Sequence, residues 1–149
     1  MSARRPALAK SSYELLAALR HALRGFLHFS EGAAHAAGLP PQQHQALLAI
    51  KGFPGRDYVS IGELAARLHL RHHSAVGLVD RLTARKLVRR VPSAEDRRRV
   101  HLELTARGDA VIDRLSAIHL RELQELGPEL RRLLALIAKS GRPTKPAGR

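Results

Sequence analysis

Residues 60–105 constrain the fold of this chain most strongly, because short helical patterns there give way to short strand patterns. The first helix is predicted to begin at a capping box. In it, the Ser60 hydroxyl accepts a bond from a first-turn amide and Glu63 reaches back to the Ser60 amide. Apolar residues then recur at helical spacing, at Ile61, Leu64, Ala65 and Leu68.

A second helix is predicted over 72–85, after a tight turn at 69–71. Its apolar stripe comprises Ala75, Leu78, Val79 and Leu82, and the opposite face is mostly polar. Two short helices joined by a tight turn predict a helix-turn-helix. In that motif the second helix enters the major groove of DNA.

A β-hairpin is predicted next, with strands at 88–91 and 100–104 around the polar loop 92–99. The loop holds three consecutive arginines, Arg97, Arg98 and Arg99. Such a run cannot be buried, and beside a recognition helix it suits the narrow, electronegative minor groove of DNA. The alternative is an ordinary solvated turn.

This combination of motifs resembles the MarR family of winged helix-turn-helix regulators. The segments that carry the resemblance are Leu64 to Leu82, Leu87-Val88-Arg89-Arg90, Asp96-Arg97-Arg98 with Leu102, and Leu104-Thr105-Ala106-Arg107-Gly108. The family's wing pattern is met by Asp96, Arg98 and Leu102. Its start to the following helix is met by Leu104, Thr105 and Gly108. With the flanking helices, the resemblance covers roughly residues 12 to 138.

Three residues depart from the family pattern. Arg71 replaces a frequent serine or aspartate cap, so the second helix is expected to be weakly capped. Lys86 stands where a glycine often ends this helix, so a strained, left-handed lysine is expected. Ser93 replaces a common aspartate at the base of the wing.

Helices are also predicted outside the central stretch. A capping box at Ser11 and Glu14 begins a helix that runs to about Ala37, and another helix spans 41–51. Tyr58-Val59 is predicted to add a minimal third strand. Thr105 caps a helix to about Leu126, Gly127-Pro128 breaks it, and a last helix spans 129–139.

The predicted fold class is therefore mainly α with a small β-wing (α+β): a winged helix-turn-helix flanked by long N- and C-terminal dimerisation helices. Residues 1–11 are expected to form a disordered arm, 12–38 and 105–139 the helical dimerisation region, 40–104 the DNA-binding region, and 140–149 a disordered basic tail. The long helices carry more apolar surface than one small domain can cover, which favours a homodimer. The two-fold axis itself is implied by the resemblance.

The composition of the chain limits the classes of partner that it can bind. The chain of 149 residues has a formal net charge of +13 and a pI near 11.5, which indicates a polyanion such as nucleic acid. No lysine-rich amphipathic helix or apolar span indicates a membrane, and no signal peptide is visible, so a cytoplasmic location is expected. Without cysteine the chain has no disulfide and no thiol sensor, although one branch of the resembled family senses oxidants through cysteine.

No enzyme chemistry and no cofactor are predicted, because no catalytic set or phosphate-binding glycine loop stands out. Nine histidines raise the alternative of a metal site. His21, His28 and His35 share a helix face, but each lies roughly 10 Å from the next, too far for one ion. His44 stands where zinc-sensing relatives have one ligand. We predict no metal site.

Candidate DNA-binding residues lie on the second helix and the wing: Arg71, His72, His73, Ser74, Val76, Gly77, Arg81, Arg85, Arg97, Arg98 and Arg99. His72, His73, Ser74 and an exposed Val76 are expected to read base edges, the valine by contact with a thymine methyl. Arg81 and Arg85 are expected on phosphates. Gly77 either permits close approach to DNA or is simply tolerated. Asp96 is expected to order the wing by pairing with Arg98.

The resemblance implies a dimeric regulator, most often a repressor, that binds a pseudo-palindromic duplex and is released by a small aromatic or phenolic effector. The expected effector contacts are Arg20, His21, Phe26, Phe29 and His44. The alternative is a constitutive or architectural DNA-binding protein with no effector. An operator-specific complex that a ligand releases would distinguish the two.

Overall fold

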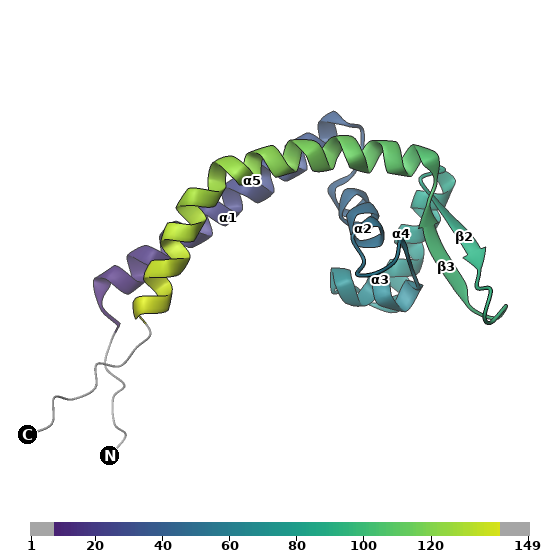
Figure 1. Cartoon of the computed structure of the whole chain (residues 1–149), viewed down its shortest axis with the longest axis horizontal. Coiled ribbons are helices and arrows are strands. Elements are labelled where there is room, and N and C mark those ends of the chain that lie inside the picture. The colour runs from purple at the N-terminus through teal and green to yellow at the C-terminus, as the bar shows by residue number, and fades with distance from the viewer. Residues whose placement is uncertain (1–7, 141–149) are drawn as a thin grey trace, which may run out of the picture. The chain divides into compact units, whose positions relative to one another are not determined.

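The computed structural model describes residues 8–140 (Figure 1). Its elements are α1 (Lys10–Ala36), α2 (Pro41–Lys51), β1 (Tyr58–Val59), α3 (Ile61–Leu68), α4 (His72–Ala84), β2 (Val88–Pro92), β3 (Val100–Leu104) and α5 (Ala106–Ser140). The chain forms two compact units, each described separately below. Among the described residues, the head unit is Ser30–His119, and the arm unit combines residues 8–29 with residues 120–140.

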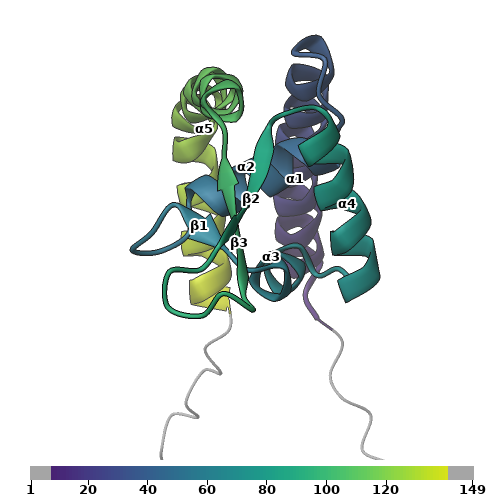
Figure 2. The same cartoon turned by 90° about the vertical axis from the view of Figure 1, so that its right-hand side faces the viewer.

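The head unit has a winged helix-turn-helix architecture, as predicted. Its three strands form an antiparallel sheet in the order β1-β3-β2, and Tyr58-Val59 is the predicted third strand. The register pairs Val88 with Leu104 and Pro92 with Val100, so β2 and β3 extend together as a wing beside α4 (Figures 1 and 2). Helices and sheet share one core, which includes Leu47, Ile50, Leu64, Leu78, Leu82, Leu102 and Ile112.

Three helices of the head unit end in the same Schellman arrangement. The amide of Leu39 donates to the carbonyl of Ala34, that of Leu70 to Ala65 and that of Leu87 to Leu82. In each case the residue directly before the donating leucine has a left-handed backbone. At the end of α1 that residue is Gly38, which adopts this conformation without strain. Elsewhere it is His69 (φ 52°) and Lys86 (φ 58°), so the predicted left-handed lysine is confirmed.

The start of α5 is anchored on the end of α4. The Thr105 hydroxyl accepts a bond from the Gly108 amide at 3.1 Å, which confirms the predicted cap, and it donates to the Lys86 carbonyl at 2.6 Å. The Thr105 amide donates to Leu87. The wing and α5 therefore meet the end of α4 at one junction.

The arm unit contains the first part of α1 and the last part of α5. Leu133 is buried, yet many large apolar side chains remain exposed: Tyr13, Leu16, Leu23, Leu27, Leu120, Leu123, Leu134 and Leu136. The surplus apolar surface expected from the sequence is therefore present within this unit.

Two helix boundaries differ from the prediction. Helix α5 continues through Gly127 and Pro128 instead of breaking there, as the unbroken ribbon of Figure 1 shows. Proline removes one helical hydrogen bond, but Leu126, Leu130 and Leu133 keep the apolar face in phase across it. Helix α1 begins at Lys10, so Ser11 is helical and is not the predicted cap.

The predicted disordered ends fall mainly on residues 1–7 and 141–149, outside the described residues. Ser140, assigned to the basic tail, is the last residue of α5. Among residues 8–140, no helix is long and apolar enough to cross a membrane.

Candidate nucleic-acid interface

Helix α4 presents its first turn to solvent. Arg71, His72 and His73 are exposed, while Ser74, Val76 and Gly77 are half-buried. Arg71 occupies the cap position without a side-chain cap bond, which confirms the expected weak cap. Val76, expected to be exposed, is partly covered.

The middle of α4 is tied to the wing. Asp80 accepts a bond from Arg90 on β2 at 2.6 Å, so the only acidic side chain of α4 is neutralised across the two elements. Arg81 is exposed and makes no ion pair with any of residues 8–140. The exposed face of α4 is consequently cationic.

The tip of the wing exposes Arg97, Arg98 and Arg99. Asp96 shapes this turn differently from the prediction. One of its carboxylate oxygens accepts a bond from the backbone amide of Arg98 at 3.0 Å, and the other lies 4.0 Å from the Arg99 guanidinium. The predicted pairing with the Arg98 side chain is therefore wrong, because backbone geometry directs the carboxylate to an amide and to the following arginine.

Ser93 closes the base of the same loop. Its side chain is buried and accepts a bond from the Glu95 amide at 3.3 Å, and its own amide donates to the Arg99 carbonyl at 2.8 Å. A short hydroxyl thus satisfies the turn where the family often has an aspartate. The wing loop remains internally hydrogen-bonded.

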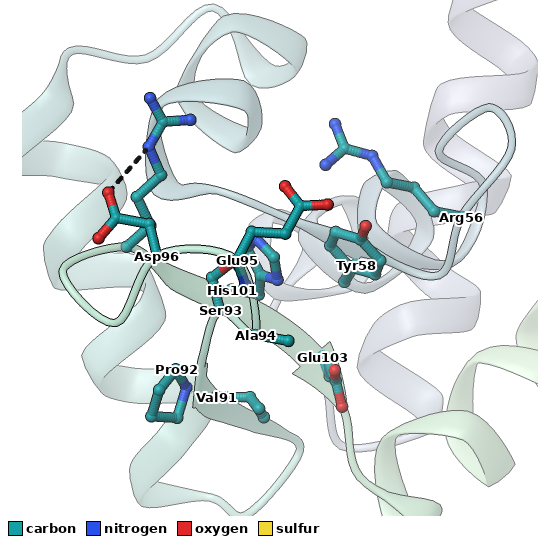
Figure 3. A pocket seen from close by; sticks show the side chains of 11 residues that line it. Arg56, Tyr58, Val91, Pro92, Ser93, Ala94, Glu95, Asp96, His101 and Glu103 are labelled. Carbon is teal, nitrogen blue, oxygen red and sulfur yellow. Dashed lines mark hydrogen bonds and ion pairs between the residues drawn. The ribbon is translucent and has the colours of Figure 1, made fainter.

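A flank of stacked cations and rings, which the sequence analysis missed, lies beside the wing. Arg56 lies over both Phe53 and Tyr58, and Tyr58 stacks on His101 with ring centroids 4.4 Å apart. A cavity of about 510 Å³ opens here, with Ser93, Glu95 and Asp96 on one side and Arg56 and Tyr58 on the other (Figure 3). The signal in the sequence was the clustering of Phe53 and Tyr58, two of only five Phe and Tyr residues, around Arg56.

The same flank is anchored to the start of α3. Glu63 and Ser60 form the predicted capping box, and Glu63 also pairs with Arg56. The bond from the Ser60 amide and the Arg56 guanidinium hold the pKa of the Glu63 carboxyl below its ordinary value. This carboxylate therefore joins the helix cap to the stacked flank.

Arg85 does not join the exposed cations. Its guanidinium donates from Nη1 to the Gln43 side chain at 2.9 Å and from Nη2 to the Gly38 carbonyl at 2.7 Å. The side chain is therefore engaged inside the head unit, and its role as a phosphate contact stays a prediction. The partners lie more than forty residues away, where sequence periodicity gives no information.

The expected effector residues fall in both units, with Arg20, His21, Phe26 and Phe29 in the arm unit and His44 in the head unit. His21 and Phe26 line a cavity of about 390 Å³ in the arm unit, with Glu122, Leu126 and Glu129. Arg20 and Phe29 are not among its lining residues.

His44 is instead buried in the head unit against His119, with ring centroids 4.7 Å apart. His119 bonds the Leu115 carbonyl and the Ser30 hydroxyl, at 2.6 and 2.7 Å. Burial, followed by the proximity of His119, lowers the pKa of His44. Among residues 8–140, no group of three or more histidine or carboxylate side chains is placed to hold a metal ion.

Comparison with known proteins agrees with this geometry. Residues 37–99 match the model of the MarR family. The structure is similar to that of a MarR family protein from Bacillus stearothermophilus, with a TM-score of 0.72 and 21% identity over 91% of this chain and 100% of that one. No curated protein sequence matches the chain significantly.

Two further structures extend the likeness. AbsC, a MarR family transcriptional regulator from Streptomyces coelicolor, has a TM-score of 0.71 at 18% identity, over 92% of this chain and 94% of that one. A mutant of S. aureus MepR bound to an oligodeoxyribonucleotide has a TM-score of 0.62 at 19% identity, over 80% and 90%. The chain therefore has the fold of MarR family transcriptional regulators.

Proposed function

We propose that the chain is a sequence-specific regulator of transcription that binds double-stranded DNA, because residues 37–99 match the model of the MarR family. One observation carries the proposal. The exposed first turn of α4 and the wing tip, two cationic groups of the head unit, have few internal charge partners. Arg71, Arg81, Arg97 and Arg98 make no ion pair with any of residues 8–140, and Arg99 has only Asp96 at 4.0 Å.

Each group suits a different part of the duplex. A helix of the size of α4 fits the major groove, where the polar side chains of its first turn can hydrogen-bond to base edges. The wing arginines suit phosphates or a narrow minor groove, and they contribute affinity that depends on salt and little on sequence. The S. aureus MepR mutant bound to an oligodeoxyribonucleotide supports this assignment by analogy.

We further propose that two copies act together. The exposed leucines of the arm unit, among them Leu16, Leu23, Leu27 and Leu134, form an apolar surface that a second copy would cover. Two recognition helices related by a two-fold axis would contact half-sites about 10 base pairs apart, centre to centre, in a pseudo-palindromic site.

Release by a small molecule completes the proposal. The arm cavity of about 390 Å³ is large enough for an aromatic ring, and Phe26 and His21 offer a stacking surface and a polar contact. Glu122 and Glu129 also line this cavity and would repel a carboxylate, which favours a phenol over an aromatic acid. In this role the chain is a repressor, whereas a constitutive DNA-binding protein would have no such effector.

The test is a titration of a cognate and a scrambled duplex at several salt concentrations. Arg97→Ala and Arg98→Ala should each weaken binding to both duplexes and flatten the salt dependence by about one unit. Arg131→Ala is the matched control, since it removes the same charge from an exposed position on the arm unit. Equal losses from Arg97→Ala and Arg131→Ala would mean that only net charge matters, and the proposed interface would be wrong.

A further inference from the structure

Arg85 lies at the C-terminal cap of α4 and joins three parts of the head unit. Its backbone ends the recognition helix, Nη1 bonds Gln43 of α2 and Nη2 bonds the carbonyl of Gly38 after α1. Gln43 is itself 5% exposed, so this contact is not a loose surface pair. Two bonds from one planar guanidinium restrict the direction of the side chain as well as its distance.

The carbonyl of Gly38, to which Arg85 donates, is held rigidly in place. Gly38 is left-handed and closes the Schellman motif of α1, in which Leu39 bonds Ala34 and both of these residues are buried. The Gly38 carbonyl therefore cannot move without opening the end of α1. Through Arg85 the end of α4 is held to the end of α1 and to the first turn of α2.

The opposite end of α4 carries the side chains proposed to read DNA. Along a helix of 13 residues the two ends are about 20 Å apart, so a tilt of about 3° moves the first turn by about 1 Å. Such a shift is comparable to the tolerance of a hydrogen bond to a base edge. The ion pair between Asp80 and Arg90 also holds α4, but it acts near the middle of the helix and therefore restrains the tilt of α4 less than a contact at its end.

We infer that Arg85 is a positioning residue for the recognition helix, which sets DNA sequence discrimination through the tilt of α4 without touching DNA. The inference rests on the proposed DNA-binding function. It assigns Arg85 a role opposite to that of a phosphate contact, and the two roles have different signatures. Loss of a phosphate contact weakens cognate and scrambled DNA alike and lowers the salt slope by about 0.9, whereas a tilted helix lowers discrimination at an unchanged slope.

The experiment measures the affinity ratio of cognate to scrambled duplex, and the salt slope, for five full-length variants. Arg85→Ala and Arg85→Lys should each reduce the ratio about tenfold and leave the slope unchanged, because lysine keeps the charge but cannot make two directed bonds. Gln43→Ala, which retains Arg85, should reduce the ratio by a smaller factor. The double change Arg85→Ala with Gln43→Ala should be no worse than Arg85→Ala alone, since both act through one contact.

Arg81→Ala is the matched control. It removes an exposed arginine one turn earlier on the same helix and should lower both affinities and the slope while sparing the ratio. Thermal melting identifies temperatures at which every variant is folded. If Arg85→Ala behaves like Arg81→Ala, or if Arg85→Lys retains full discrimination, the positioning role is wrong. If the unmodified chain shows no discrimination between duplexes, the proposed function fails instead, and this outcome is separate.

Discussion

The carbonyl oxygen of Leu87 occupies the space that a side chain at residue 108 would need. A β-carbon built on Gly108 would lie 2.1 Å from this oxygen, far inside van der Waals contact. The oxygen belongs to the backbone of Leu87, which lies between α4 and β2. The same carbonyl accepts a bond from the Thr105 amide, so it cannot move away freely. Gly108 therefore permits α5 to start against the end of the recognition helix.

Gly108→Ala should destabilise the head unit by about 3 kcal/mol, because the added methyl displaces backbone and not a flexible side chain. Gly32→Ala is the matched control. Gly32 lies inside α1 with nothing within 4 Å of the added carbon, so alanine should stabilise the helix by about 1 kcal/mol. Urea denaturation of both variants measures the contrast. Equal behaviour of the two would show that the α4–α5 junction is not tightly packed.

Lys86→Gly should stabilise the chain by about 1 kcal/mol, because glycine relieves the left-handed conformation at a modest entropic cost in the unfolded state. Lys86→Ala removes the same charge but retains the strain, so it should give no gain. Differential scanning calorimetry would show the difference as a rise in Tm for glycine alone. A similar rise for both variants would attribute the effect to charge.

Acid should weaken the head unit through His44. Its pKa lies below the ordinary value of 6.5 when folded, so below about pH 6.5 the unfolded chain binds more protons and the free energy of unfolding falls. The loss is complete once the pH is below the folded pKa. His44→Phe retains a buried ring without titrating and should flatten this dependence, measured by urea denaturation from about pH 8 to pH 5. His35→Gln, at an exposed position, should leave the dependence as it is.

Asp96→Ala should weaken DNA binding even though it makes the chain more positive, because the wing turn loses its acceptor for the Arg98 amide. Asp96→Asn is the informative partner variant. It keeps an oxygen acceptor and removes only the charge, so binding should be largely retained. Fluorescence anisotropy on one duplex at fixed salt suffices, and tighter binding by Asp96→Ala would show that the carboxylate merely opposes the phosphates.

The sequence predicted elements well where local periodicity determines them. The capping box at Ser60 and Glu63 depends on residues adjacent in the chain, and the structure has it. The left-handed Lys86 was implied by the family resemblance, and the strand at Tyr58 forms by pairing with the distant Glu103; the structure has both. Local signals also misled at Gly127-Pro128. There the tertiary packing of Leu133, which is 1% exposed, offsets one missing helical bond.

The candidate site was predictable only in outline. The exposed arginines of the wing followed from their run in the polar loop between two predicted strands, but the partners of individual side chains could not be predicted. Arg85 meets Gln43 and Gly38 across the fold, and Asp96 meets a backbone amide whose direction depends on the turn. Where a side chain can bond either a neighbour or a distant element, the tertiary structure determines which partner it takes. Sequence periodicity does not encode that choice.

The half-buried state of Val76 sharpens the prediction for the recognition helix. Part of its surface packs on the head unit, so Val76→Ala should cost a little stability as well as any contact with DNA. If the remaining surface meets a thymine methyl, the variant should lose about 1 kcal/mol of affinity at sites with that thymine and little elsewhere. Titration of cognate duplexes with thymine or with uracil at each position isolates the methyl group. Val76→Thr, of similar shape but with a hydroxyl, serves as the companion variant. Should Val76→Ala weaken cognate and scrambled duplexes equally, Val76 is a packing residue, and a different face of α4 meets the groove.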